Sequence, residues 1–126
     1  MAQLEHVNIT VSDAAATASW LAEAFGWHIR WQGEAMSGAG RTIHVGTDDA
    51  YVALYQPCDQ TGRADSNYIT TGGLNHVAVT VDDLDAADER VRAAGFEPHS
   101  HADYEPGRRF YFHDADGIEW EVVSYA

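Results

Sequence analysis

The stretches HVNITVSD (6–13) and HVAVTVDD (76–83) are two copies of one segment, separated by 70 residues. Five of the eight positions are identical, and Ile9 of the first copy is replaced by the equally β-branched Val79. In both copies every second residue is apolar, which is typical of a strand with one buried face. The repeat therefore predicts that one supersecondary unit occurs twice in the chain.

A helical stretch follows each copy and ends in glycine plus an aromatic residue, in AAATASWLAEAFGW (14–27) and LDAADERVRAAGF (84–96). Gly26 and Gly95 suit the left-handed position after a helix. Each helix has two candidate N-cap residues, Ser12 or Asp13 in the first and Asp82 or Asp83 in the second.

Two further segments match without a gap when Ala53 is set opposite Glu121, namely RTIHVGTDDAYVA (41–53) and RFYFHDADGIEWE (109–121). Each unit then becomes strand, helix, strand and a two-stranded hairpin. We expect an α+β fold of two tandem βαβββ modules in a single domain of residues 1–126. The predicted parts are module 1 (1–57), a polar linker rich in turn-forming residues (58–72) and module 2 (73–126).

The charge is strongly unbalanced, because 20 acidic residues face only 7 basic ones, for a formal net charge of −13. Such a surface repels phosphate backbones and anionic lipids, so we expect no nucleic-acid partner and no membrane partner. All the basic residues are arginines, and the absence of lysine excludes Schiff-base and P-loop chemistry.

Cellular location is predicted from the same inventory. The single Cys58 has no partner for an internal disulfide, and the segment MAQLEHVNIT has neither the basic start nor the apolar run of a signal peptide. No stretch approaches the 18 or so apolar residues of a membrane span. We expect a cytoplasmic protein.

Strand alternation separates the side chains into two faces. It places His6 and His76 on the face turned away from the helices, and it places Glu121 on that face between Trp120 and Val122. A carboxylate in a core strand is costly to bury unless something pairs with it, and a cation is the natural partner. The sequence gives His28, His44 and His113 no evident partner, and they are interpreted as structural.

The paired HVxhTVxD starts and the DxDGxxxE segment (114–121) resemble the vicinal oxygen chelate superfamily of glyoxalase I, bleomycin-resistance proteins, extradiol dioxygenases and fosfomycin-resistance enzymes. The resemblance covers essentially the whole chain and implies that the modules form a curved mixed-sheet cleft. Family members bind a divalent metal through the first-strand and last-strand residue of each module. The corresponding residues here are His6, Ala53, His76 and Glu121.

Ala53 offers no metal ligand, and alternation puts the nearby Gln56 on the opposite face. The resemblance therefore implies a metal site of His6, His76 and Glu121. Two histidines and one carboxylate suit Fe(II) or Mn(II), and Zn(II), Ni(II) and Co(II) are compatible with the same set. This ligand set is that of the extradiol dioxygenase and fosfomycin-resistance branches.

Catalytic roles are implied for Tyr111, Glu121 and His101. In both of those branches a tyrosine ten residues before the glutamate lines the pocket, and alternation places Tyr111 opposite Phe110 and Phe112, on the face of Glu121. His99 and His101 are expected to share one face, so that one of them, His101 in particular, carries protons near the metal.

The chain also departs from both branches. Ala115 stands where the extradiol signature has proline, and the histidine that this signature places before Phe110 is missing at its usual spacing. The segment YEPGRR (104–109) provides only two arginines for a phosphonate, so a phosphonate substrate is not expected.

The leading prediction is a divalent-metal-dependent enzyme whose small substrate chelates the metal through vicinal oxygens, with lyase, isomerase and dioxygenase reactions all open. The alternative is a non-catalytic protein of the bleomycin-resistance type, which sequesters a cationic drug between aromatic residues such as Trp31, Tyr51 and Tyr55. A homodimer is expected in either case, with the metal site built within one chain or across two.

Overall fold

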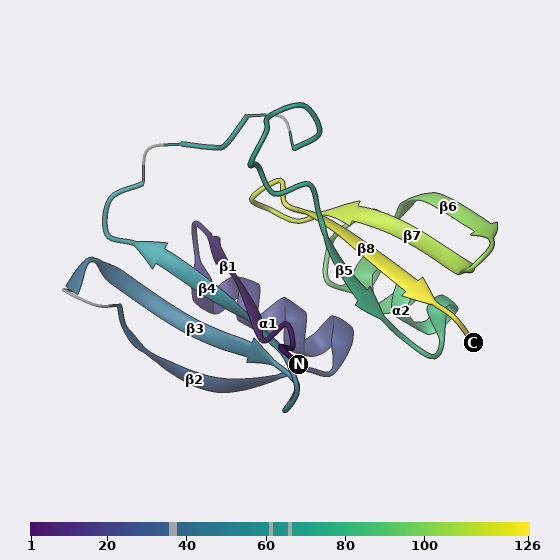
Figure 1. Cartoon of the computed structure of the whole chain (residues 1–126), viewed down its shortest axis with the longest axis horizontal. Helices are drawn as coiled ribbons and strands as arrows, with labels where there is room; N and C mark the ends of the chain where they lie inside the picture. Colours follow the sequence, from purple (N-terminus) through teal and green to yellow (C-terminus); the bar gives the residue numbers. More distant parts are fainter. Residues whose placement is uncertain (36–37, 61, 66) are drawn as a thin grey trace. The chain divides into compact units, whose positions relative to one another are not determined.

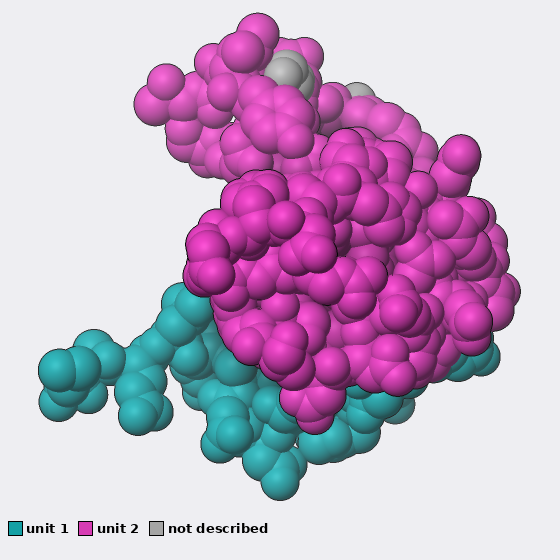
Figure 2. Space-filling view, turned by 90° about the vertical axis from the view of Figure 1, so that its right-hand side faces the viewer, with its two compact units in different colours: residues 1–61 teal, residues 62–126 magenta. Residues whose placement is uncertain are grey.

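Each copy of the repeated strand opens a unit of the same architecture in the computed structural model, which describes residues 1–35, 38–60, 62–65 and 67–126 (Figure 1). The chain divides into two compact units, Met1–Thr61 and Gly62–Ala126, which Figure 2 shows in different colours. The predicted boundaries of the modules and of the linker stay predictions. Residues 61 and 66 of that linker lie outside the described residues.

The first unit is a four-stranded mixed sheet with one helix. Its elements are β1 (His6–Thr10), α1 (Ala14–Phe25), β2 (His28–Glu34), β3 (Gly40–Gly46) and β4 (Tyr51–Pro57). The strand order is β1-β4-β3-β2, with β1 parallel to β4 and the other pairs antiparallel.

The second unit repeats this arrangement with β5 (Val77–Thr80), α2 (Leu84–Ala93), β6 (His99–Tyr104), β7 (Gly107–His113) and β8 (Glu119–Ser124). The strand order is β5-β8-β7-β6, again with only the first pair parallel. The predicted α+β fold of two βαβββ modules, each with a mixed sheet, is confirmed. No helix in the described part of the chain has the length and apolar character needed to cross a membrane.

The helix ends follow the predicted capping. Asp13 and Asp83 are the N-caps, and each carboxylate accepts a hydrogen bond of 3.0 Å from the backbone N–H three residues later. Gly26 ends α1 in the left-handed region with φ of 71°. The N–H of Ala14 donates to Gln56 Oε1 at 2.8 Å, which confirms that Gln56 points to the helix side of its sheet.

Buried side chains of the second unit fill the space between its sheet and α2. Phe110, Phe112 and Trp120 are fully buried, and the rings of Phe112 and Trp120 stack with centroids 6.5 Å apart. Leu84 and Val91 of α2 complete this core. Alternation along β7 and β8 therefore leaves the residues between these aromatics on the opposite face of the sheet.

The gap-free match between the two hairpins is wrong by one residue. Cα pairing sets His44 opposite Ala53 in the first unit and Tyr111 opposite Glu121 in the second, so the spacing is nine residues in one and ten in the other. The connection from β7 to β8 is longer by one residue than that from β3 to β4. In the longer turn Asp114 Oδ1 accepts from the N–H groups of Asp116 and Ile118 at 2.9 and 3.0 Å.

A bulge interrupts β6. Its pairing with β7 shifts between His99 and Ala102, and Ser100 has a positive φ of 55°. An extra residue in one strand reverses the alternation of side chains beyond it. The equivalent strand of the first unit, β2, has a register shift between Ile29 and Trp31.

Candidate metal centre

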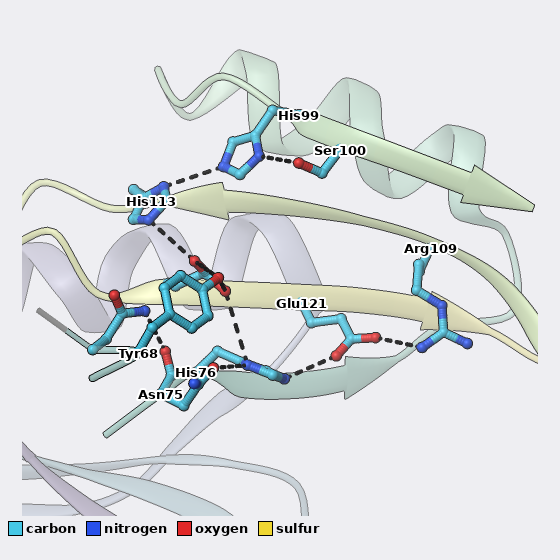
Figure 3. Close-up of polar contacts among 10 residues, drawn as sticks. Tyr68, Asn75, His76, His99, Ser100, Arg109, His113 and Glu121 are labelled. Atoms are coloured by element: carbon cyan, nitrogen blue, oxygen red, sulfur yellow. Dashed lines mark hydrogen bonds and ion pairs between the residues drawn. The ribbon is translucent and has the colours of Figure 1, made fainter. Parts of the chain in front are cut away.

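Glu121 lies on the face of the second sheet that is turned away from α2, and we call this face of each sheet its open face. Two side chains reach the Glu121 carboxylate there (Figure 3). His76 Nε2 is 3.0 Å from Oε1, and Arg109 Nη1 donates to Oε2 at 2.9 Å. The strand order explains the meeting, because β8 runs between β5 and β7 and pairs Glu121 with Ala78 on one side and Tyr111 on the other. Glu121 is buried, with 6% of its surface exposed, so its charge depends on these partners.

The ring of His76 is oriented by the residue before it. Its Nδ1 lies 2.7 Å from Asn75 Oδ1, an amide oxygen that accepts a hydrogen bond from the tautomer protonated at Nδ1. In that tautomer Nε2, which lies 3.0 Å from Glu121 Oε1, carries the lone pair that a metal ion needs. A histidine whose second nitrogen is bonded to an oxygen acceptor is the arrangement of a metal ligand.

His6 has the same arrangement in the first unit. Its Nδ1 is 2.7 Å from Glu5 Oε1, and its ring stacks on Tyr51 with centroids 4.9 Å apart. The hydrogen bond from His6 holds the pKa of Glu5 below its ordinary value. In both units, therefore, the residue before the first-strand histidine contacts its Nδ1. Nε2 is the ring nitrogen that this neighbour does not contact.

Tyr111 also faces this site. Its ring makes an edge contact with His76, with centroids 5.8 Å apart. Burial, together with the negative charge of Glu121, raises the pKa of its hydroxyl above 10. Tyr111 is therefore neutral at physiological pH, and its hydroxyl keeps a proton that it can donate in a hydrogen bond.

A second buried carboxylate, that of Glu119, was not identified in the sequence. Tyr68 donates to both of its oxygens at 2.5 and 2.6 Å, His113 Nε2 is 3.3 Å from Oε1, and His76 Nδ1 is 3.8 Å from Oε2. The contact with Glu119 raises the pKa of Tyr68 to about 12. The sequence revealed no partner for His113, and the structure supplies two, Glu119 and His99.

Alternation could have found most of these residues, because Arg109 and His113 flank Tyr111 on β7 and Glu119 flanks Glu121 on β8 at intervals of two. Tyr68 carries no such signal, since it belongs to the predicted linker. Tyr68 and its neighbour Asn67 nevertheless belong to the second unit, where Asn67 Nδ2 donates to the carbonyl of Asn75 at 2.6 Å.

The expectation that His99 and His101 share one face is wrong, because the bulge at Ser100 separates them. His99 stacks beside Tyr111 and lies 3.1 Å from His113 Nδ1. His101 instead bonds Asp88 of α2 at 2.7 Å and stacks on the buried ring of Phe110. His101 is thus on the helix side of the sheet, and its position gives no support to the predicted proton transfer at Glu121.

The open face of the first unit carries a row of rings that crosses all four strands. Trp31 lies 5.1 Å from His44 between centroids, His44 lies 4.6 Å from Tyr51, and Tyr51 stacks on His6. Burial, with the nearby charges of His6 and Arg30, holds the pKa of His44 below 6.5. Trp31 is half exposed, so this end of the row is accessible to solvent.

The donors at Glu121 fit a divalent ion. Two ligands of one ion, each about 2.0–2.2 Å from the metal, lie about 3 Å apart, which is the separation of His76 Nε2 and Glu121 Oε1. Neither unit, in its described residues, holds three His, Cys, Asp or Glu side chains grouped for a metal. Ala53 occupies the register position of Glu121 in the first unit, so this position offers no metal ligand there.

Several solved structures resemble this fold. The glyoxylase/bleomycin resistance protein/dioxygenase domain from Frankia sp. EAN1pec has 23% identity and a TM-score of 0.83, with 98% of each chain covered. The fosfomycin resistance protein FosX from Mesorhizobium loti has 25% identity and a TM-score of 0.71 over 98% of this chain and 91% of its own. A mutant FosX from Listeria monocytogenes, complexed with Mn(II) and 1S,2S-dihydroxypropylphosphonic acid, has 20% identity and a TM-score of 0.71 over 98% and 90%.

A comparison with curated proteins gives no match. The sequence does match the family profile of the Glyoxalase/Bleomycin resistance protein/Dioxygenase superfamily over residues 3–122. That match spans both units and includes both first-strand histidines and Glu121. The chain belongs to the Glyoxalase/Bleomycin resistance protein/Dioxygenase superfamily.

Proposed function

We propose that this protein is a divalent-metal-dependent enzyme acting on a small substrate that chelates the metal through two neighbouring oxygens. The observation that carries the proposal is the pair of His76 Nε2 and Glu121 Oε1 at 3.0 Å, with His76 held through Nδ1 by Asn75. The bound Mn(II) in the FosX complex supports a divalent ion in a related fold.

The ligands in this proposal are His6, His76 and Glu121. His6 is oriented in the same way as His76, since Glu5 accepts a hydrogen bond from its Nδ1–H, and it completes the set from this chain or from a second copy. Two histidines and one carboxylate favour Fe(II) or Mn(II) and accept Zn(II), Ni(II) or Co(II). When bound, the ion supplies Lewis-acid stabilisation of negative charge on the substrate oxygens.

The residues around Glu121 prepare the site for that chemistry. Arg109 holds one oxygen of Glu121, so the other oxygen faces His76 in a fixed orientation. Tyr111 keeps its proton at neutral pH and donates a hydrogen bond to a developing oxyanion, or a proton to a carbanion. Lyase, isomerase and dioxygenase reactions all use these functions, and the proposal extends to the three classes.

Elemental analysis of protein purified without a metal-affinity tag tests the proposal. We expect about one divalent ion per chain, lost in His76→Ala and in Glu121→Gln and retained in His101→Gln, which changes a histidine on the helix side of the same sheet. Absence of any stoichiometric metal, after dialysis against Mn(II) or Fe(II) as well, would overturn the proposal.

The row of aromatic rings in the first unit favours a second candidate function, the sequestering of a planar cationic drug without turnover. Trp31 is half exposed at one end of the row, and Glu5 lies beside His6 at the other. A drug of this kind would quench tryptophan fluorescence with an affinity that a chelator leaves unchanged and that Trp31→Ala weakens. Binding that disappears with the metal would instead favour the enzyme.

A homodimer forms part of both proposals. In both of them a second copy could contribute to the site, in the enzyme by supplying a metal ligand. Light scattering is expected to give twice the mass of one chain. A monomeric protein that still binds one ion would place all the ligands within one chain.

A further inference from the structure

Two histidines face each other at the edge of the open face of the second unit, away from Glu121 (Figure 3). His99 Nε2, on β6, lies 3.1 Å from His113 Nδ1, on β7. The rings are nearly parallel, with an angle of 16° between their planes. The bulge at Ser100 creates this pair, because it keeps His99 on the same face as His113 while it turns His101 to the helix side.

The outer nitrogen of each ring lies beside an oxygen. His113 Nε2 is 3.3 Å from the Glu119 carboxylate, which only accepts, and this contact favours the tautomer of His113 protonated at Nε2. His99 Nδ1 is 2.9 Å from the hydroxyl of Ser100, which donates or accepts. When Ser100 donates, His99 Nε2–H donates to His113 Nδ1 and the pair is a hydrogen bond. When Ser100 accepts, the proton of His99 is on Nδ1, and a shared metal ion can take the place of the proton between the two inner nitrogens.

The separation of the inner nitrogens matches that of two ligands on one ion. Metal–nitrogen bonds of about 2.0–2.1 Å at angles near 90–110° place the two nitrogens about 2.9–3.4 Å apart. The contact between His113 Nε2 and the Glu119 carboxylate is of the kind that orients a metal-binding histidine through its second nitrogen. The net charge of −13 raises the local concentration of cations.

We propose that His99 Nε2 and His113 Nδ1 bind a second divalent transition-metal ion, separate from the ion proposed at His76 and Glu121. Imidazole nitrogen selects Zn(II), Cu(II) or Ni(II) over Mg(II) and Ca(II). Two protein ligands leave the remaining positions to water, so this ion binds more weakly than one with three ligands. Glu119 lies between the two sites, 3.3 Å from His113 and 3.8 Å from His76.

Calorimetric titration of the metal-free, tag-free protein with Zn(II) tests the proposal. We expect a weaker binding event beside the tight one, and His113→Gln and His99→Gln each raise its half-saturation concentration about tenfold or more. His101→Gln is the matched control, because it removes a neighbouring histidine of the same strand and leaves the weak event unchanged. Circular dichroism spectra identify any variant that does not fold, and the other variant of the pair then decides.

The two metal proposals fail independently. His76→Ala removes the tight event and leaves the weak one if both proposals hold, and a missing tight event with an intact weak event overturns only the proposed function. Long-range nitrogen NMR of the imidazoles gives a direct readout, since Zn(II) at the weak site shifts His99 Nε2 and His113 Nδ1. An unchanged weak event in both glutamine variants, or Zn(II)-induced shifts at His101 instead, would overturn the pair as a site.

Discussion

Arg109 binds one oxygen of Glu121 at 2.9 Å and leaves the other oxygen to His76, so a positive side chain already compensates the charge of a buried carboxylate. Arg109 is itself mostly buried. Removing it leaves Glu121 without its cationic partner, and breaking such a pair typically costs about 3–5 kcal/mol.

We therefore expect Arg109→Met to lower the melting temperature of the metal-free protein and to increase the stabilisation gained on adding Mn(II) or Zn(II). Thermal unfolding with and without metal measures both effects. Arg108→Met is the control, because its partner Asp85 is exposed. An equal metal-induced shift in Arg109→Met and the unaltered protein would contradict the inference that Arg109 compensates the charge of Glu121 when no metal is bound.

Glu5 and Asn75, which accept hydrogen bonds from Nδ1 of His6 and His76, should matter for metal affinity. We expect Asn75→Ala to weaken metal binding about 10–100-fold, because His76 loses the contact that fixes its tautomer and orientation. Asn75→Asp preserves an acceptor and should retain most of the affinity. Competition titration against a metal indicator measures the series, and equal affinities for Asn75→Ala and Asn75→Asp would refute this role.

Glu119 should control the ionisation of Tyr68, whose pKa it raises to about 12. We expect the absorbance of the protein near 295 nm to show one tyrosine that ionises only at strongly alkaline pH. Glu119→Gln should return the pKa of that tyrosine toward 10, because the negatively charged acceptor is gone. Tyr68→Phe should remove the ionisation step at strongly alkaline pH, which we call the late step. A late step that survives in Tyr68→Phe would assign it to another tyrosine.

The pairing of Asp88 makes stability depend on pH. Burial alone would raise the pKa of Asp88, but the hydrogen bonds from His101 and Arg92 outweigh it and hold the pKa below 3.8. A lowered carboxyl pKa contributes stability that is present above the unfolded value near 3.8 and is lost as the pH falls through the folded value.

Arg92→Gln should therefore lower the melting temperature at pH 6 more than at pH 2. Melting temperatures of the variant and the unaltered protein across this range measure the difference. In an Asp88→Asn background the same change should have no pH-dependent effect. A constant difference at every pH would show that Arg92 acts through packing alone.

Gly107 is required by a close approach of backbone. A Cβ at this position would lie 2.3 Å from the carbonyl oxygen of Ser124, and the corresponding Gly40 of the first unit would meet that of Gln56 at the same distance. We expect Gly107→Ala and Gly40→Ala each to destabilise the protein by about 1–3 kcal/mol, as overpacking does. Gly73→Ala, with its nearest contact at 3.1 Å, should cost less in the same denaturant titration.

The sequence predicted the order of elements in both units because one repeat carried several agreeing signals. The repeated strand, the capping residues Asp13 and Asp83 and the alternation around Trp120 all depend on local chemistry, and each was confirmed. The length difference between the hairpins was missed because both turns are rich in aspartate. Asp114 organises the longer one by bonding two backbone N–H groups, a role that composition does not reveal.

The candidate site could be predicted only in part. His76, Tyr111 and Glu121 follow from alternation along undisturbed strands, and the structure brings these three together. Tyr68 could not be found, since its contact with Glu119 spans 51 residues and leaves no periodic signal. The prediction that His101 lies on the same face as His99 failed because the sequence near Ser100 contains no signal of a bulge.

The bulge divides β6 into two parts that pair with β7 in different registers. Before Ser100 the odd-numbered position, His99, belongs to the open face; after it, Ala102 pairs with Arg109 and the even-numbered positions take over that face. Deletion of Ser100 would remove the extra residue and leave His99 opposite Tyr111, His101 opposite Phe110 and Ala102 opposite Arg109. The strand would then be regular and would present the same two faces, so one inserted residue is what lets two histidines at an interval of two occupy opposite sides of the sheet.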